Sequence, residues 1–167
     1  GTGPNSVDAA DFDEDGDIDV MSTSFSNDFT QGRIHFHENI AGALQAATHL
    51  NIIDAPGKIL AANFDNDVNG NVDLVVTNIA SASISVAIGN GALDYTVSSI
   101  NVIGGPGGVN SIAVGRADAV GGVDDIVVSY TDINSNGFVA VLINNGDGTF
   151  AAPVAYSTGG TGSQGVI

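Results

Sequence analysis

Two short acid-rich loops contain the residues of this chain that could bind a metal ion. The first loop reads D-x-D-x-D-G-x-x-D and runs from Asp11 to Asp19. Carboxylates at alternate positions can converge on one point, the glycine permits a sharp turn, and a backbone carbonyl at the seventh position adds an oxygen. Calcium takes about six to eight oxygen ligands, whereas zinc and copper prefer nitrogen or sulfur. The loop therefore predicts a calcium site, although it lacks the helices and terminal glutamate of an EF-hand.

The second loop runs from Asp65 to Asp73 and fits the same template with Asn69 at the fifth position. A competing alignment starts at Asn63 and treats residues 68 and 69 as an insertion, because Phe12 and Phe64 then align. We prefer the unbroken loop. The predicted calcium-binding residues of the two loops are Asp11, Asp13, Asp15, Asp17, Asp19, Asp65, Asp67, Asn69, Asn71 and Asp73.

The third loop, Arg116 to Asp125, occupies the corresponding place further along the chain. It lacks the alternating carboxylates and carries Arg116 near its first position. We expect this loop to bind no calcium and the arginine to replace the cation. In the first two loops, closely spaced carboxylates repel one another, and a bound ion relieves this repulsion. Calcium is therefore predicted to stabilise the fold.

The three loops belong to an internal repeat of about fifty residues. Pro4, Pro56 and Pro106 stand at similar positions, each followed by a short strand-like segment, a loop and an apolar run. The predicted boundaries of the units are residues 1–52, 53–104 and 105–158, with 159–167 as the start of a next repeat or a strand between subunits.

Each repeat is predicted to form four antiparallel strands, which is the size of a propeller blade. Short runs of Val, Ile, Ala and Thr alternate with Gly, Asn, Asp and Ser, and helical periodicity is nearly absent. Asn-Gly pairs at Asn90 and Asn145 suit tight hairpins. The fold is therefore predicted to be all-β, a partial or oligomer-completed β-propeller. In the second repeat the expected strands are Lys58–Ala62, Val72–Thr77, Ser83–Ile88 and Tyr95–Val102.

The amino-acid composition of the chain limits which binding partners it can have. The chain has 3 Lys plus Arg against 19 Asp plus Glu, a formal charge of -16. Nucleic acid and anionic membrane surfaces are repelled by such a charge, so we expect neither as a partner. The longest apolar run, Phe138 to Ile143, is far too short for a membrane-spanning helix. The sequence starts at Gly1 and not at Met, which suggests a removed leader or a part of a longer protein.

The chain resembles the FG-GAP and VCBS-type repeats of the integrin alpha-subunit head, a fungal sugar-binding propeller and many bacterial surface proteins. The resemblance rests on the segments Ala10 to Val20, Asn63 to Val76 and Val141 to Val154. It implies blades of a β-propeller whose aspartate-rich loops bind calcium. The ligand roles it implies here fall on Asp11, Asp13, Asp15 and Asp19, and on Asp65, Asp67, Asn69 and Asp73.

Catalytic and transition-metal chemistry fit the sequence less well. His35-Phe36-His37 places two imidazoles on one face of a strand, but polar alternation on a half-exposed strand explains the pair, and His49 lies in a different strand. Paired carboxylates could serve a glycosidase, yet here they have the spacing of a metal loop. No Gly-x-Ser-x-Gly elbow and no phosphate-binding glycine loop occur. We expect no enzyme.

The leading hypothesis is a calcium-binding extracellular β-propeller module, secreted or on a cell surface, that acts in adhesion or as a structural or filament component. Its expected partner is a protein or glycan surface ligand, and the chain could also form homo-oligomers or filaments. One alternative is a carbohydrate-binding lectin propeller. Another is the non-catalytic propeller part of a secreted enzyme.

Overall fold

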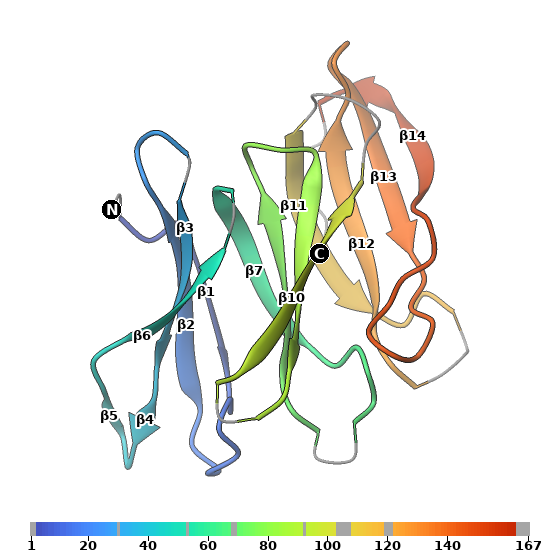
Figure 1. Cartoon of the computed structure of the whole chain (residues 1–167). Coiled ribbons are helices and arrows are strands. Elements are labelled where there is room, and N and C mark those ends of the chain that lie inside the picture. The colour runs from blue at the N-terminus through green and yellow to red at the C-terminus, as the bar shows by residue number, and fades with distance from the viewer. Residues whose placement is uncertain are drawn as a thin grey trace.

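The computed structural model describes residues 3–29, 31–52, 54–67, 70–91, 93–102, 108–118 and 122–162. Within these ranges the chain contains strands, turns and bends and no helix. Most strands belong to three four-stranded antiparallel sheets, which stand side by side in chain order (Figure 1). The prediction of an all-β chain with four antiparallel strands in each sheet is confirmed.

The first sheet has the strand order β1-β2-β3-β6, and a two-stranded hairpin, β4-β5, lies between its third and fourth strands. A search of the described part of the chain for a membrane-spanning helix finds none. The strands of this sheet and its hairpin are β1 (Ser6–Ala10), β2 (Asp19–Phe25), β3 (Gly32–His37), β4 (Asn39–Ile40), β5 (Ala43–Leu44) and β6 (Thr48–Ile52).

The second and third sheets are built from consecutive strands in chain order. The four strands expected in the second repeat are confirmed to within two residues at each end. The last strand, β14, continues to Thr161, past the predicted end of the third repeat, and residues 163–167 lie outside the described part. The strands are β7 (Pro56–Ala62), β8 (Asp73–Asn78), β9 (Ser83–Gly89), β10 (Tyr95–Asn101), β11 (Gly108–Gly115), β12 (Asp125–Thr131), β13 (Asn136–Leu142) and β14 (Val154–Thr161).

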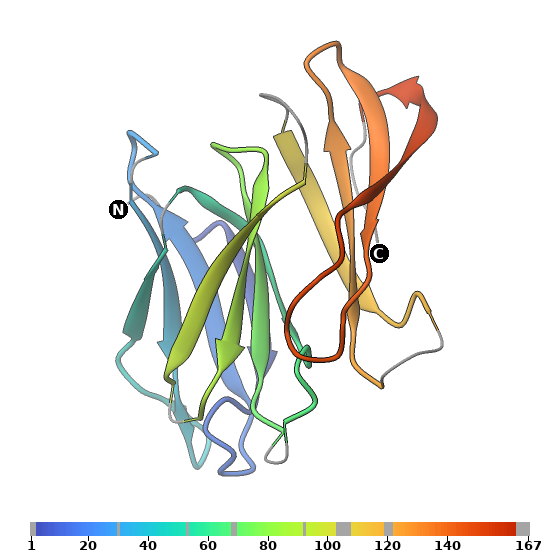
Figure 2. The same cartoon turned by 45° about the vertical axis from the view of Figure 1, so that its right-hand side comes forward.

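The three sheets stand next to one another (Figure 2), and two hydrophobic cores lie between neighbouring sheets. Successive side chains of a strand point to opposite faces, so in β8 Leu74 and Val76 join the core with the first sheet while Val75 joins the core with the third. All six residues of β8 are therefore buried. Because each fully buried Val or Leu side chain contributes about 1.5–3 kcal/mol, each sheet depends on its neighbour for stability, as in other repeat proteins.

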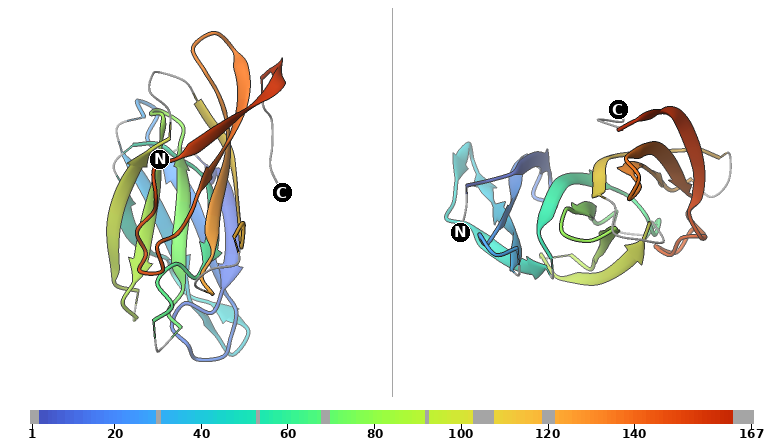
Figure 3. Two further views of the ribbon diagram at one scale, coloured as in Figure 1. Left: turned by 90° about the vertical axis from the view of Figure 1, so that its right-hand side faces the viewer. Right: turned by 90° about the horizontal axis from the view of Figure 1, so that it is seen from above.

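The first strands of the three sheets lie next to one another (Figure 3). The amide of Ala61 in β7 donates to Asp8 Oδ2 in β1 at 2.9 Å. On the other side, Lys58 Nζ donates to the carbonyl of Ile112 in β11 at 2.8 Å. Each of the three loops connects the first strand of its sheet to the second strand, so all three leave their sheets in the same way.

Candidate metal centre

A buried aspartate ends each of the three loops. Asp19, Asp73 and Asp125 are the first residues of β2, β8 and β12, and their exposed fractions are 1%, 0% and 2%. In each, Oδ2 accepts a hydrogen bond from a backbone amide at the start of the same loop. The donors are Phe12 at 2.9 Å, Phe64 at 2.6 Å and Ala117 at 2.7 Å.

The second oxygen of each aspartate binds the chain at the end of the third strand of the sheet or just beyond it. Oδ1 of Asp19, Asp73 and Asp125 accepts from the amides of Asn39 at 2.7 Å, Gly89 at 2.8 Å and Asn144 at 2.8 Å. We call the three aspartates, with the amides they bind, the aspartate clasps. Hydrogen bonds to charged groups contribute about 1.5–3 kcal/mol each, so a clasp fixes the loop to its sheet without any metal.

The clasps also show which loop positions are equivalent. Because Phe12 and Phe64 donate to the same atom of their clasps, Asn63 and not Asp65 corresponds to Asp11. The clasp hydrogen bond spans seven residues in the first loop and nine in the second. The second loop therefore contains an insertion, and these hydrogen bonds favour the competing alignment over the unbroken loop that we preferred from the sequence.

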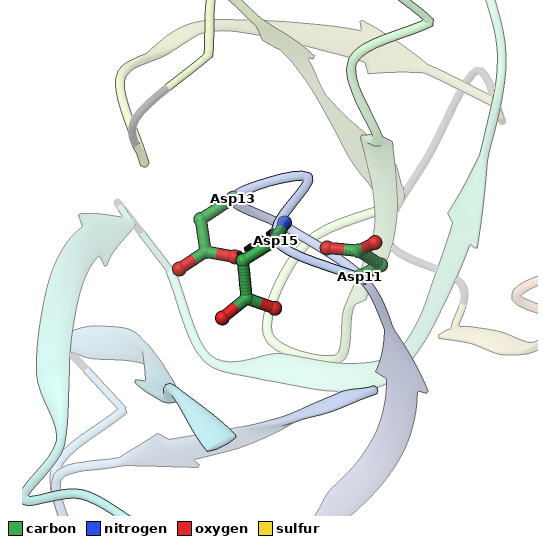
Figure 4. A group of neighbouring side chains, drawn as sticks. All are labelled: Asp11, Asp13 and Asp15. Carbon is green, nitrogen blue, oxygen red and sulfur yellow. Dashed lines mark hydrogen bonds between the residues drawn. The ribbon is translucent and has the colours of Figure 1, made fainter. Parts of the chain in front are cut away.

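Three carboxylates of the first loop point toward one another (Figure 4). Oxygens of Asp11, Asp13 and Asp15 all lie within 4.8 Å of one another. The backbone turns tightly beneath them, since Gly16 has a φ of 93° and donates its amide to Asp11 Oδ2 at 3.0 Å. Asp11 Oδ1 is buried and has no hydrogen-bond partner within the described ranges. This buried, unpaired oxygen belongs to a group of carboxylates that could hold a cation.

Glu38, which the sequence did not suggest, adds a carboxylate to this group. Burial first, and then the charge of Asp13 and a side-chain hydrogen bond with it, raise the pKa of Glu38. Asp15 and Asp19 raise this pKa further. Glu38 directly follows β3, whose end pairs with the start of β2 through His37 and Val20. Only the pairing of β3 with β2 could have identified Glu38 as a member of this group, and that pairing is a tertiary feature.

Two predicted residues of the first loop lie outside this group. Asp17 Oδ2 accepts from the amide of Ala41 at 2.9 Å and so faces the β4-β5 hairpin. Asp19 uses both oxygens in its clasp. The structure thus brings together Asp11, Asp13 and Asp15, while Asp17 and Asp19 support the loop around them.

The second loop holds its acids differently. Asp67 Oδ1 accepts from the amide of Asn71 at 3.0 Å, and the Asn71 side chain donates to Asp67 Oδ2. The amide of Asp67 donates to Asp65 Oδ1 at 3.1 Å. Asn69 lies outside the described residues. Asp11, Asp13 and Asp15 form the one convergent group of three acids or histidines found within the described ranges, so none is seen in this loop.

In the clasp of the second loop, the charged form of Asp73 is destabilised. Burial raises the pKa of Asp73 to about 6, and the charges of Asp65 and Asp67 raise it as well. The hydrogen bonds from the amides of Phe64 and Gly89 oppose this change, because they stabilise the charged carboxylate. A cation bound near Asp65 and Asp67 would remove part of the cost of ionising Asp73.

The third loop has an aspartate clasp, but it lacks the alternating acids of the first loop. Arg116 stands next to Ala117, at the position that Asp11 has in the first loop. Its Nη2 donates to the carbonyl of Gly122 at 2.7 Å, so the guanidinium ties the two sides of the loop together.

Aromatic side chains connect the loops to the next sheet along the chain. The Phe64 ring meets the Phe150 ring edge to face with centroids 5.3 Å apart. The carbonyl of Phe64 accepts from the amide of Gly148 at 3.0 Å and from Asn144 Nδ2 at 2.7 Å. At the other junction Tyr95 stacks on Phe36, with centroids 5.4 Å apart. Through Phe64, the shape of the second loop therefore influences how the second and third sheets pack.

Comparison of the chain with protein-family models and with curated proteins finds no match. The resemblance to FG-GAP and VCBS-type repeats thus remains a prediction from the residues quoted above.

Proposed function

We propose that this chain is a calcium-binding, extracellular β-propeller repeat module with an adhesive or structural role. The observation that carries the proposal is the convergence of Asp11, Asp13 and Asp15, with Asp11 Oδ1 buried and unpaired among the described residues. Exposed acidic groups often occur without a metal, but a buried carboxylate oxygen without a donor is costly unless a cation or another partner meets it.

Calcium fits this site better than other cations. The candidate ligands are the carboxylate oxygens of the three aspartates and of Glu38, and no histidine or cysteine converges with them within the described ranges. Hard oxygen donors in a flexible loop suit calcium. The formal charge of -16 also raises the local concentration of divalent cations. Extracellular calcium modules bind with dissociation constants of about 10⁻⁴–10⁻³ M, which suits an extracellular location.

The ion would act through the loop on the packing of the sheets. It would neutralise the repulsion among the first-loop carboxylates and fix the segment between Phe12 and the Asp19 clasp. Phe12 packs edge to face on Phe36 with centroids 5.5 Å apart, inside the core between the first and second sheets. A ligand present at about 100 times its dissociation constant stabilises a folded protein by about 2.7 kcal/mol.

A scaffold role agrees with where the acids lie. Pockets of about 470 and 380 Å³ occur among the described residues, and none of the predicted metal ligands lines either of them. The acids are instead engaged in the turns of their own loops. Their role in the proposal is therefore to hold a structural ion.

Isothermal titration calorimetry with calcium tests the proposal. The wild-type chain should bind calcium, and Asp13→Asn should weaken the first site at least tenfold, because it removes one of three converging carboxylates. Asp118→Asn is the matched control, since Asp118 holds the same position in the third loop. Absence of calcium binding at millimolar concentration, or an equal loss in both variants, contradicts the proposal.

A further inference from the structure

A pocket of about 380 Å³ lies between the first and second sheets, so this chain itself forms both of its walls. Small-ligand sites have volumes of about 300–1,000 Å³. β6 and β10, the fourth strands of the two sheets, lie on the same side of the row, away from the first strands (Figure 3). The described lining comes from these two strands, from β9 and from the segment after β6, and it includes Ile52, Asp54, Ser85, Val97 and Ser99.

The two junctions between neighbouring sheets differ at this place. Where the second and third sheets meet, Tyr130 and Phe138 pair across β12 and β13 and stack with ring centroids 5.2 Å apart. Counted from the clasp aspartates, the same pair of positions in the second sheet holds Asn78 and Ser83. The fold therefore accepts apolar packing here, and the polar residues of the first junction depart from it, as residues at functional sites often do.

A chain of hydrogen bonds leads from these buried polar residues to Asp54. Asn78 and Ser83 are 0% and 3% exposed, and Asn78 Nδ2 donates to Ser83 Oγ at 2.9 Å. Ser81 Oγ donates to Asp54 Oδ2 at 3.2 Å, so its contact with Ser83 Oγ at 2.8 Å must be one in which Ser83 donates. All these donors point toward the carboxylate, which fixes its orientation. Asp54 Oδ1 has no hydrogen-bond partner among the described residues.

The backbone around Asp54 is also held in place. Asp54 has a φ of 81°, in the left-handed region that aspartate and asparagine adopt more readily than most residues. A Cβ atom at Gly32 would clash with the carbonyl oxygen of Asp54, so this segment passes very close to β3. The amide of Ile79 donates to the carbonyl of Ala55 at 2.9 Å. The segment is therefore fixed to both sheets.

The hydroxyl groups of the pocket already use their protons. Ser85 and Ser99 pair across β9 and β10, and both belong to the face of the second sheet that meets the first. Ser85 Oγ donates to Asn78 Oδ1, and Ser99 Oγ donates to the carbonyl of Ile84, each at 3.4 Å. Because a hydroxyl oxygen has two lone pairs and a single proton, both side chains can still accept but not donate.

Asp54 is the one charged residue among the described lining residues, which include no Lys, Arg or His. Asn51 and Ser98 also line the pocket, but they belong to the other faces of β6 and β10, because successive strand residues alternate. Ile52 and Val97 add apolar surface. The pocket thus offers a carboxylate, hydroxyl acceptors and an apolar wall, and it requires a ligand that supplies the hydrogen-bond donors.

We infer that this pocket binds a primary ammonium group on a short apolar arm, which a lysine side chain or a free alkylamine would supply. An ammonium group has three donors and no acceptor. Asp54 pairs with its charge, Ser85 and Ser99 accept its remaining hydrogen bonds, and Ile52 and Val97 contact the methylene groups. The inference goes beyond the calcium proposal and uses none of its residues.

The charge of the chain and the make-up of the pocket both favour an organic cation. A formal charge of -16 attracts cations at long range and repels anions. Calcium prefers a shell of several carboxylate and carbonyl oxygens, whereas this pocket combines a single carboxylate with neutral hydroxyls and apolar side chains. Ion pairs that stay in contact with water are weak, so we expect a dissociation constant in the millimolar range.

Amide proton and nitrogen-15 resonances of the protein test the inference in a titration with Nα-acetyl-lysine methylamide, with calcium present. Nα-acetyl-norleucine methylamide is the matched probe, because it has the same carbon arm without the ammonium group. We expect saturable shifts at Ile52, Val97 and Ser99 with the lysine compound only. Butylamine distinguishes the sources: weaker binding than the lysine compound points to a lysine of a partner protein, and binding that is equal or tighter points to a free amine.

Two variants remove the proposed partner of the ammonium group in different ways. Asp54→Asn keeps the size and backbone preference of the residue and should weaken binding about fivefold or more. Asp94→Asn, which removes an exposed acid in the turn before β10, should leave it unchanged. Val97→Lys places an ammonium group within the pocket at a position that is 41% exposed, and should block binding while Asp54 is intact.

Several results would overturn the inference. Equal binding of the norleucine compound removes the role of the ammonium group, and equal losses in Asp54→Asn and Asp94→Asn indicate only general charge. Absence of saturable shifts at tens of millimolar of the lysine compound and of butylamine removes the site itself. Asp13→Asn should keep the binding, which separates failure of this pocket from failure of the calcium site.

Discussion

The first and third loops have the same backbone clasp and opposite electrostatics. Asp19 and Asp125 each bind an amide at the start of the loop and another beyond the third strand. Around this common frame the first loop has three converging carboxylates, whereas the third has Arg116 bound to a carbonyl. The comparison teaches that the clasp forms without the alternating acids, which are an addition to the first loop.

The position of Glu38 also distinguishes the acidic first loop from the others. Because Asn39, Gly89 and Asn144 bind equivalent clasp oxygens, the residues before them correspond. Glu38 therefore has Ile88 and Ile143 as its counterparts in the other sheets. A carboxylate occurs at this position only beside the loop that has three converging acids, which supports a shared role in holding a cation.

The largest expected effect comes from removing a clasp. Asp125→Ala leaves the amides of Ala117, Asp118 and Asn144 without this acceptor, which should lower the free energy of unfolding by about 3–5 kcal/mol. Urea unfolding should show the same loss with calcium and with chelator, because the third loop is expected to bind no ion. A loss below about 1 kcal/mol, or one that depends on calcium, would show that the clasp does not shape the loop.

The next effect is a pH dependence from the second loop. The pKa of Asp73 is raised to about 6, against about 3.9 in the unfolded chain. The folded state therefore binds this proton more tightly, and the resulting stabilisation is present below about pH 4 and lost as the pH rises to about 6. The loss amounts to about 3 kcal/mol in calcium-free protein.

Carbon-13 resonances of the Asp73 carboxyl group measure this titration directly. Asp67→Asn should lower the midpoint, because it removes one of the two neighbouring charges, while burial still keeps it above the ordinary value. A titration midpoint of wild-type Asp73 near the ordinary aspartate value would mean that the charged form of this residue is not destabilised in the fold.

A smaller effect is expected from Glu38→Gln. The change keeps the size of the side chain and removes a charge beside Asp13 and Asp15, so calcium affinity should fall about fivefold. Calorimetric titration measures this loss, and Ile143→Gln at the corresponding place of the third sheet serves as the control. Unchanged affinity in Glu38→Gln would separate this residue from the metal site.

The smallest effect belongs to Arg116. Its hydrogen bond to Gly122 lies in an exposed loop, so Arg116→Gln should cost only about 0.5–1 kcal/mol. Thermal unfolding should show the same small shift with calcium and with chelator. A calcium-dependent shift would mean that the third loop also binds the ion.

Short apolar runs and turn residues were enough to predict the strands of the second sheet, because such runs and Asn-Gly turns are local signals. The convergence of Asp11, Asp13 and Asp15 could also be foreseen from their spacing. The alignment of the second loop could not, since it depends on which amide reaches Asp73. Glu38, and the pairing of His35 in β3 with His49 in β6, were missed for the same reason, because they depend on which strands lie side by side.

Thermal unfolding of the wild-type chain, with millimolar calcium and with excess chelator, tests the central claim most directly. A metal held by Asp11, Asp13 and Asp15 should raise the midpoint clearly in calcium, and the double variant Asp13→Asn, Asp15→Asn should lose that rise while remaining folded. Identical midpoints for the wild-type chain in both conditions would contradict the account.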